Sequence, residues 1–336
     1  MRSMISLGAL ALAASVGGVA VAQSADNLHG PDVSAYSGGE VDDGDGRRID
    51  LGLSVSSHGG TTYTLAGSHA DVDSEAGPLV STAAATGLEH DFGRFGLSGG
   101  IRQVREADVS KALTWLAGVY ADVEPARLGA TVERRNIDFD DTPFTVSGSD
   151  LGLTGVTSAT GTAACSLTST GYGANGRLDE PRWSLYGSAI AYHYSGYDCS
   201  STLTELAVGG SQIPVTPGSR APISVRHPVI FQRVAANVTR AFDGLTASRI
   251  PRETALLEST LMLGAELTTS ARTTFGVEAY RDADEFAPTK TTTFLAYLDW
   301  RVTEVVSITS TIGTSDSDSL GRLQFLGVRA TASFGM

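Results

Sequence analysis

The stretch at residues 292–302, TTFLAYLDWRV, alternates between two kinds of side chain along its whole length. One set, which is apolar, consists of Phe294, Ala296, Leu298, Trp300 and Val302. The other set carries the charges of Asp299 and Arg301. A period of two is typical of a β-strand with two unlike faces. In a soluble sandwich the apolar face would be buried, whereas in a membrane barrel it would meet lipid and the charges would line the lumen.

The same two-faced pattern recurs along the chain. It predicts strands near 49–56, 61–68, 83–92, 95–105, 113–122, 126–139, 164–178, 182–195, 228–242, 254–267, 271–281, 291–302, 304–313 and 322–334. Residues 254–267 also fit a helix, but strands flank them on both sides. Between the turns at 179–181 and 269–270 the pattern indicates three strands, where a barrel needs an even number. Either one assignment is wrong or a weak strand lies in 201–212. In the second case a further weak strand at 32–41 would bring the total to sixteen. The sequence therefore predicts 14–16 strands.

Very short connections alternate with long polar ones. The short ones lie at 93–94, 124–125, 179–181, 269–270 and 303, and the long ones at 69–82, 140–163, 196–227, 282–290 and 315–321. Short turns at one end and long loops at the other are typical of outer-membrane barrels. The 140–163 loop has few charges beyond its start, so it either folds inward to narrow the lumen or lies on the surface.

The N-terminus indicates export. Residues 1–22 carry one charge, at Arg2, then an apolar run that ends in Ala20-Val21-Ala22, which is typical of a cleaved signal peptide. We expect an N-terminal segment at 23–48 and the barrel at 49–336. No later segment has 18 consecutive apolar residues, so a membrane-spanning form would have to be a closed barrel. The formal net charge of −13 excludes a nucleic-acid binder.

The chain has two cysteines, Cys165 and Cys199. Export leads to an oxidising compartment, where a disulfide is the default state. The strands predicted at 164–178 and 182–195 form a hairpin with a turn at 179–181, which brings both cysteines near its open end. We therefore expect a disulfide, with two buried free thiols as the alternative.

Together, the signal peptide, the two-faced strands, the turn pattern and the final strand LQFLGVRATASFGM resemble the outer-membrane β-barrels of Gram-negative bacteria, and in size the porins. The resemblance covers most of the chain but rests on a pattern, with no specific motif. Such barrels usually end on an aromatic residue, whereas here Phe334 is third from last. The resemblance implies an all-β, transmembrane antiparallel barrel in the Gram-negative outer membrane. It also implies lipid, lipopolysaccharide and the barrel-assembly machinery as partners, and it leaves open a homo-oligomer.

In this orientation the apolar faces meet lipid and the charged faces meet the lumen. The predicted lumen-facing side chains are Asp50, Glu89, Asp91, Arg102, Asp122, Arg127, Glu133, Arg135, Arg233, Glu258, Glu266, Glu278, Asp299, Arg301 and Arg329. Unpaired charges are costly in lipid, so these groups belong in water or in pairs. The predicted function is a porin-like channel for small hydrophilic solutes or ions. The alternative is a barrel cross-linked by arginine–carboxylate pairs, which conducts nothing and serves structure or surface interaction.

A third hypothesis is an outer-membrane lipid hydrolase. His193 and Ser195 lie two residues apart on a predicted strand, so they share a face and could form a base and nucleophile pair. The pair resembles the one in outer-membrane phospholipase and lipid A deacylase, but no residue that would orient the histidine is evident, and Gly196-Tyr197 follows where the phospholipase has Asn-Gly. Tyrosines and a histidine in an interfacial belt would look the same. We therefore predict no enzyme, no cofactor and no metal site.

Overall fold

The computed structural model describes residues 32–44, 46–74, 77–106, 109–215, 228–242, 256–286, 289–318 and 321–335. The expected signal peptide at 1–22 lies outside these residues. The strands are β1 (Asp32–Asp42), β2 (Arg47–Ser56), β3 (Thr61–Ser74), β4 (Gly77–Asp91), β5 (Phe95–Glu106), β6 (Ser110–Val123), β7 (Ala126–Ser147), β8 (Val156–Asp179), β9 (Trp183–Val208), β10 (Ser211–Pro214), β11 (Leu257–Ser270), β12 (Thr273–Asp284), β13 (Lys290–Arg301), β14 (Val306–Ser317) and β15 (Gly321–Gly335). Two helical elements are present in this part of the chain, the 3₁₀ turn η1 (Ser149–Leu151) and the α-helix α1 (Pro228–Phe242).

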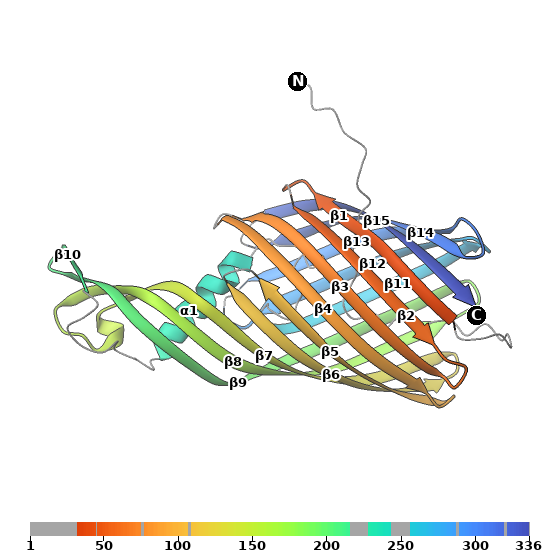
Figure 1. Ribbon diagram of the computed structural model, residues 1–336, viewed down its shortest axis with the longest axis horizontal. Coiled ribbons are helices and arrows are strands. Elements are labelled where there is room, and N and C mark those ends of the chain that lie inside the picture. Colours follow the sequence, from red (N-terminus) through yellow and green to blue (C-terminus); the bar gives the residue numbers. More distant parts are fainter. Residues whose placement is uncertain are drawn as a thin grey trace, which may run out of the picture.

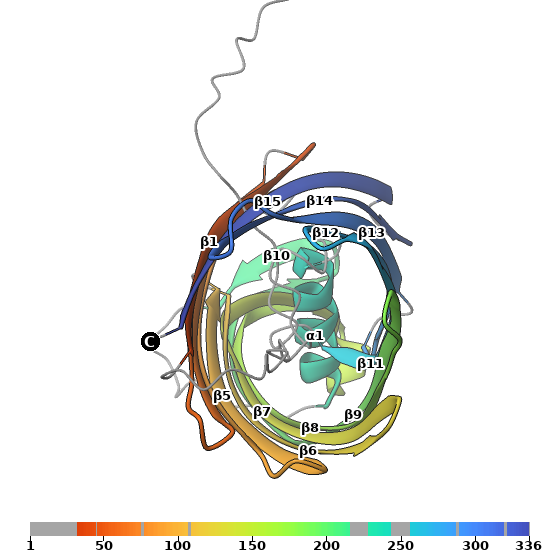
Figure 2. The ribbon, with the colours of Figure 1, turned by 90° about the vertical axis from the view of Figure 1, so that its right-hand side faces the viewer.

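Fourteen of these strands form a closed wall. Their hydrogen-bonded order is β1-β15-β14-β13-β12-β11-β9-β8-β7-β6-β5-β4-β3-β2, and β10 pairs only with β9. β1 also lies beside β2, which closes the sheet into a ring (Figure 2). Every pairing is antiparallel. The predicted fold class, an all-β antiparallel barrel of 14–16 strands, is therefore confirmed at the lower number.

The two termini of the sheet lie at one end of the barrel, where Asp32 is paired with Gly335. The turns at 57–60, 92–94, 124–125, 180–182, 271–272 and 302–305 lie at the same end. We call this the short-turn end. The strand β1 falls within the segment 23–48, so the sheet begins earlier in the chain than the expected start of the barrel at residue 49.

The outer surface of the wall is apolar. In β13, the stretch considered first, Phe294, Leu298 and Trp300 are 56%, 44% and 51% exposed, whereas the inward Thr293 is 2% exposed. A soluble sandwich would bury these large side chains, because their exposure to water is costly. The apolar face therefore points out, toward lipid, and the polar face points in. No helix in the described part of the chain has the length and hydropathy needed to cross a bilayer.

Strands β7, β8 and β9 extend well past the other strands at the end opposite the short turns (Figure 1). Along β7 the apolar face changes sides. Leu128 and Val132 point outward and are 58% and 46% exposed, whereas Ile137 and Phe139 point inward and are 0% and 1% exposed. The inversion occurs where the outward face becomes polar at Arg134. Such an inversion is expected where strands leave the hydrocarbon and become an ordinary water-facing sheet.

The extension has its own hydrophobic core, which is built around α1. We define the outer lobe as residues 137–167 and 199–214 together with α1. Four residues of the helix, Ile230, Phe231, Val234 and Ala235, are at most 4% exposed. They pack against strand residues that include Ile137, Phe139, Phe144, Val146, Ala159, Ala163, Leu167 and Leu203. The lobe is thus a sheet with one face covered by an amphipathic helix.

The prediction of a strand at 228–242 was wrong, because this segment is α1. Its buried residues recur at positions i, i+1, i+4 and i+5 from Ile230, which is the helical period, and Pro228 occupies the favoured first position. Removing this strand leaves β9 and β11 between the turns at 179–181 and 269–270, so the number is even. The segment 201–212 adds no wall strand, since β9 continues to Val208 and β10 folds back on it. The weak strand at 32–41 is confirmed as β1.

Three predicted loops were largely wrong. Most of 69–82 and 140–163 belongs to β3, β4, β7 and β8, and part of 196–227 belongs to β9 and β10. Beyond the apolar band the described outward faces of β7, β8 and β9 carry polar residues and no longer show the alternation of a lipid-facing strand. The 140–163 segment does not fold into the lumen. The interior of the ring instead contains α1, which lies toward the extended end (Figures 1 and 2).

Candidate functional site

The inner wall of the barrel carries most of the side chains predicted to face the lumen. They alternate with the exposed apolar residues of the same strands. On this basis the inward residues include Asp50, Glu89, Asp91, Arg102, Asp122, Arg127, Glu133, Arg135, Glu266, Glu278, Asp299, Arg301 and Arg329. Their burial varies along the wall: Asp50 and Arg135 are 2% exposed, whereas Arg301 is exposed at the end of β13.

Two of the predicted residues lie elsewhere. Arg233 is an exposed residue of α1, on a helix in place of the predicted strand. Glu258 is exposed beside the buried Leu257, because a register shift between Leu257 and Ser259 interrupts the alternation of β11. A β-bulge of this kind reverses the face on which the following residues lie. Neither position could be placed from the period of two alone.

A repeated pair of residues shapes the inner wall. In each pair a glycine lies against an aromatic ring from the neighbouring strand, so closely that an added Cβ would overlap the ring. The pairs are Gly52–Tyr36, Gly96–Tyr120, Gly171–Tyr192, Gly264–Tyr186, Gly276–Tyr297 and Gly313–Phe325. Five of them are directly opposed in register. An edge of each ring therefore lies over the backbone of the neighbouring strand, in the space that a Cβ would fill.

Four of these tyrosines carry an arginine over the ring. The distances from the guanidinium carbon to the ring centre are 5.0 Å for Arg329–Tyr36, 4.2 Å for Arg127–Tyr120, 4.0 Å for Arg135–Tyr192 and 5.5 Å for Arg177–Tyr186. Such stacking suits the planar guanidinium better than the ammonium of lysine. Each stacked arginine is thereby held along the wall.

Carboxylates complete these units. Arg127 Nη2 donates to Asp122 Oδ2 at 2.8 Å, and Arg135 Nη2 donates to Glu133 Oε2 at 2.9 Å. A third pair joins Arg48 Nε to Asp50 Oδ1 at 2.9 Å, where both side chains are 2% exposed. Charged groups this deeply buried require such partners.

The largest cluster lies on β8, β9, β11, β12 and β13. Its carboxylates are Glu266 and Glu278, which Arg177 and three tyrosines surround. Glu266 accepts hydrogen bonds from Arg177 Nη2 at 2.9 Å, from Ser184 Oγ at 2.9 Å and from the Tyr297 hydroxyl. Glu278 accepts from the Tyr186 hydroxyl at 2.6 Å and from Tyr280. We call this group the carboxylate–tyrosine cluster.

These polar contacts follow the wall. Each ion pair described above joins residues on the same strand, on adjacent strands or, for Arg177 with Glu266, on strands two apart. The arginines and carboxylates thus stabilise the wall without reaching across the barrel. The carboxylate–tyrosine cluster contains two acids of the lumen and one arginine, which also pairs with Asp179 at 2.7 Å, so its net charge is negative.

Sequence reasoning missed several members of this wall. Arg48, Arg177 and the tyrosines at positions 36, 120, 186, 192 and 297 were not among the predicted lumen residues. Their parity placed them on the polar face, but a tyrosine can belong to either face of a barrel strand. The signal that could have identified them is a glycine opposite an aromatic residue in the strand register, which requires the register to be known first.

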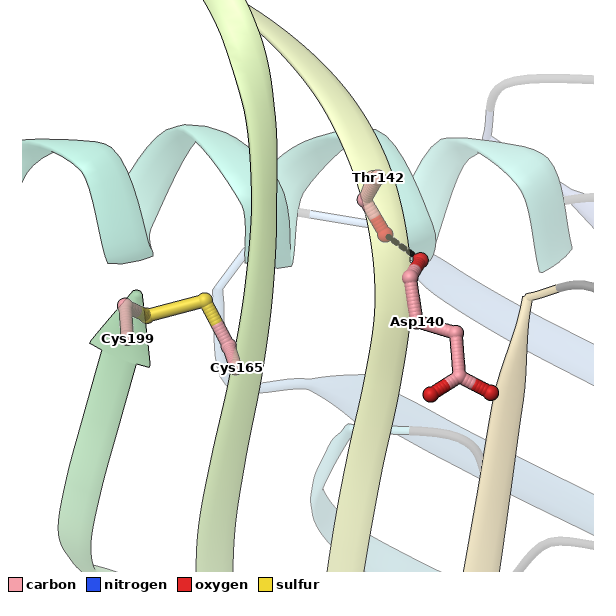
Figure 3. The surroundings of a disulfide bond; sticks show 4 residues. All are labelled: Asp140, Thr142, Cys165 and Cys199. Atoms are coloured by element: carbon pink, nitrogen blue, oxygen red, sulfur yellow. Dashed lines mark hydrogen bonds between the residues drawn. A yellow bond between two sulfur atoms is a disulfide. The ribbon is translucent and has the colours of Figure 1, made fainter. Parts of the chain in front are cut away.

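The predicted disulfide is confirmed between Cys165 and Cys199 (Figure 3). The two residues are directly opposed on β8 and β9, with their Cα atoms 4.1 Å apart. The bond lies in the core of the outer lobe. It thus joins the two strands at the level where α1 covers them.

Several contacts hold α1 at the extended end of the barrel. Asn237 Nδ2 donates to the Pro143 carbonyl at 3.0 Å, and the ring of Phe231 stacks on Tyr197 with centres 4.6 Å apart. Phe286, from the connection after β12, meets Phe231 edge to face at 5.3 Å. The opposite side of the helix, with Gln232 and Arg233, is exposed. The helix therefore covers one side of the barrel mouth and presents polar side chains away from the lobe.

The pair considered for hydrolysis lies outside the wall. His193 and Ser195 are exposed on the outward face of β9, opposite Thr170 and Thr168 of β8. Within the described residues, no hydrogen bond joins the imidazole to the hydroxyl. No group of three or more His, Cys, Asp or Glu side chains able to hold a metal ion is found there either.

The closed antiparallel wall, the apolar exterior and the charged interior define an outer-membrane type of β-barrel, porin-like in architecture. No protein-family model matches the sequence. No curated protein matches it either.

Solved structures with a similar fold are barrels. They include the KdgM porin, with a TM-score of 0.38 and 9% identity over 90% of this chain and 99% of that one. A FadL homologue of Pseudomonas aeruginosa gives a TM-score of 0.44 and 10% identity over 90% of this chain and 88% of that one. OmpT lacking loop L8, an outer membrane protein of Vibrio cholerae, gives a TM-score of 0.42 and 10% identity over 90% of this chain and 98% of that one. With TM-scores below 0.5 and identities near 10%, these likenesses carry no weight for the fold or the function, which rest on the geometry described above.

Proposed function

We propose that the protein is a channel in the Gram-negative outer membrane that passes small hydrophilic solutes or ions. The observation that supports it is the arrangement of the inner wall. Its arginines stack on tyrosines and its ion pairs join the same or nearby strands, so the charged groups lie along the wall and not across the lumen. A barrel of eight strands fills with its own side chains, whereas one of 16–18 leaves a water-filled channel. Fourteen strands, with aromatic rings packed over glycines of the wall, favour the open form.

The channel would prefer cations. The carboxylate–tyrosine cluster has a net negative charge, because it holds two lumen acids and one arginine, which pairs with Glu266. A passing ion about 6 Å from one such charge in water gains about 0.7 kcal/mol, which corresponds to roughly a threefold preference. The helix α1 would narrow the mouth on one side.

The test is single-channel conductance in a planar bilayer, with a salt gradient across it. We expect discrete conductance steps and a reversal potential on the cation side. Replacing Glu266 and Glu278 together by Gln should lower the cation preference about threefold per charge. Asp316→Asn, which removes the same charge from the outer face of β14, is the matched control and should leave the reversal potential unchanged.

A barrel that does not conduct is the second candidate, and the position of α1 within the outline of the ring favours it. In that case the folded protein would give a silent bilayer, whereas a variant in which α1 is loosened should conduct. The lipid hydrolase has no such support from the structure. If a lipid-ester activity were found, its loss in Ser195→Ala would be required to keep that hypothesis.

A further inference from the structure

The apolar exterior has a hollow on β5, β6 and β7. It has a volume of about 390 Å³ and is lined by Leu97, Ser98, Ala117, Gly118, Val119, Ala130 and Val132. Leu97, Val119 and Val132 are 46%, 52% and 46% exposed, so they form raised sides on the lipid-facing surface. Its floor is low because Ala117 and Ala130 are small and Gly118 has no side chain.

A row of polar and aromatic side chains lies directly beyond the hollow, toward the extended end. In register, Trp115 is opposite Arg134, Arg134 is opposite Thr170, and Thr170 is opposite His193. Arg134 lies two residues beyond Val132 on the same outward face, a rise of about 7 Å. This is also the level at which the apolar face of β7 changes sides. The row therefore stands at the boundary between hydrocarbon and water.

The positive charge of Arg134 is not neutralised within the part of the chain that the structure describes. Among the described residues, no carboxylate lies within ion-pair distance of Arg134, which is exposed. The nearby acids are engaged farther out, where Asp138 and Asp140 lie 3.8 Å and 3.9 Å from the Lys111 ammonium. Arg134 and His193 are two strands apart, about 10 Å, so one headgroup can lie between them.

We propose that this surface binds a phosphorylated lipid of the outer leaflet, with an acyl chain in the hollow and a phosphate on Arg134 and His193. Arginine binds phosphate through two parallel hydrogen bonds, and Trp115 suits the interface where chain and headgroup meet. The exposed His193, considered first for hydrolysis, then serves as a headgroup contact. The proposal depends on the outer-membrane location but not on an open pore.

The hollow distinguishes a lipid from a free phosphate. A phosphate alone would need only Arg134 and His193, whereas an acyl chain also needs the space above Ala117 and Ala130. Filling that space should therefore weaken a lipid and leave an inorganic anion unaffected. The two sources make opposite predictions for one substitution, Ala130→Leu.

The experiment uses the full-length barrel reconstituted in vesicles of phosphatidylethanolamine and lipid A, then extracted and examined by native mass spectrometry. We expect lipid A to remain bound to the unaltered protein. Arg134→Gln should lower the bound fraction about tenfold, the loss expected for one hydrogen bond to a charged group. Arg281→Gln is the matched control, because Arg281 is likewise exposed on the outward face of a strand, β12, but without the hollow.

The outcomes separate the alternatives. Loss of lipid A in both Arg134→Gln and Ala130→Leu, with retention in Arg281→Gln, supports the proposed site. Equal retention in Arg134→Gln and Arg281→Gln would overturn it. Loss in Arg134→Gln with full retention in Ala130→Leu would also overturn it, since the surface would then be an anion site without a chain. Heat-modified mobility on SDS gels checks that each variant is folded.

Discussion

At the residue scale, the inner wall rests on a glycine paired with an aromatic ring from the next strand. In β12 and β13 this pair is Gly276 with Tyr297, whose hydroxyl also donates to Glu266. Because the ring occupies the place of a Cβ, the glycine is required by close approach and not by an unusual backbone angle. The pair thus couples the packing of the wall to the position of a charged group in the lumen.

Gly276→Ala should therefore destabilise the barrel by about 1–3 kcal/mol, the usual cost of overpacking. Gly99→Ala is the matched control, since the nearest atom to its added Cβ is the Leu116 carbonyl oxygen at 3.6 Å, an ordinary contact. The measurement is the midpoint of urea unfolding followed by tryptophan fluorescence. Equal midpoints for the two variants would show that Tyr297 moves aside without cost.

At the element scale, α1 and the extended strands form one unit. The helix buries Ile230, Phe231, Val234 and Ala235 against the lobe, and Asn237 also donates to the Pro143 carbonyl. Phe231→Ala together with Val234→Ala should cost the helix several kcal/mol of packing, since each large-to-small change costs about 1–5 kcal/mol. If α1 narrows the mouth, unitary conductance should rise.

Gln232→Ala serves as the control, because Gln232 lies on the exposed side of the helix. It should leave the conductance unchanged. A double variant with the conductance of the unaltered protein would show that α1 does not restrict the path.

The disulfide should stabilise the lobe and leave the barrel unaffected. In the chain-entropy description, closing a loop of 34 residues contributes up to about 4 kcal/mol. Replacing both Cys165 and Cys199 by Ser should therefore speed hydrogen exchange in α1 and in the ends of β8 and β9. Exchange in β12, β13 and β14, far from the bond, should stay the same. If the exchange rates in α1 and in the ends of β8 and β9 were the same with and without the disulfide, the packing of α1 alone would hold the lobe.

Sequence reasoning found the wall but not the lobe. The strands that touch lipid, such as β13, can be recognised by the alternation of apolar and polar residues, because one face meets lipid and the other meets water. Beyond the hydrocarbon the outward face of β7 turns polar at Arg134, and the inward face turns apolar at Ile137. The alternation then changes phase within a single strand, so the same rule that identified β7 as far as residue 139 misread its outer part as a loop.

The inner wall was partly predictable for a similar reason. Parity assigns Glu266 and Glu278 to the polar face without knowledge of any neighbour. It does not show that Arg177 meets Glu266 across β9, because that contact depends on the register of three strands. Glu258 shows the limit most directly, since one bulge was enough to move it from the expected face.

At the scale of the whole molecule, the even number of wall strands brings both ends of the sheet to the short-turn end. If that end faces the periplasm, the outer lobe faces the exterior of the cell. An epitope inserted at Gly152, in the turn between β7 and β8, should then be labelled on intact cells. The same epitope at Gly59, in the short turn after β2, should be labelled only after the outer membrane is permeabilised. The reverse pattern would contradict the orientation.

The outer lobe also bears on how the molecule is put in place. A chain inserted from the periplasm must send the ends of β7, β8 and β9 across the hydrocarbon, with polar outward residues such as Arg134 and Asp138. If the disulfide between Cys165 and Cys199 forms in the periplasm first, the outer ends of β8 and β9 cross the membrane as a cross-linked hairpin and not as a single extended chain. The aperture that admits it must then be at least a hairpin wide, which makes the timing of oxidation a control on export.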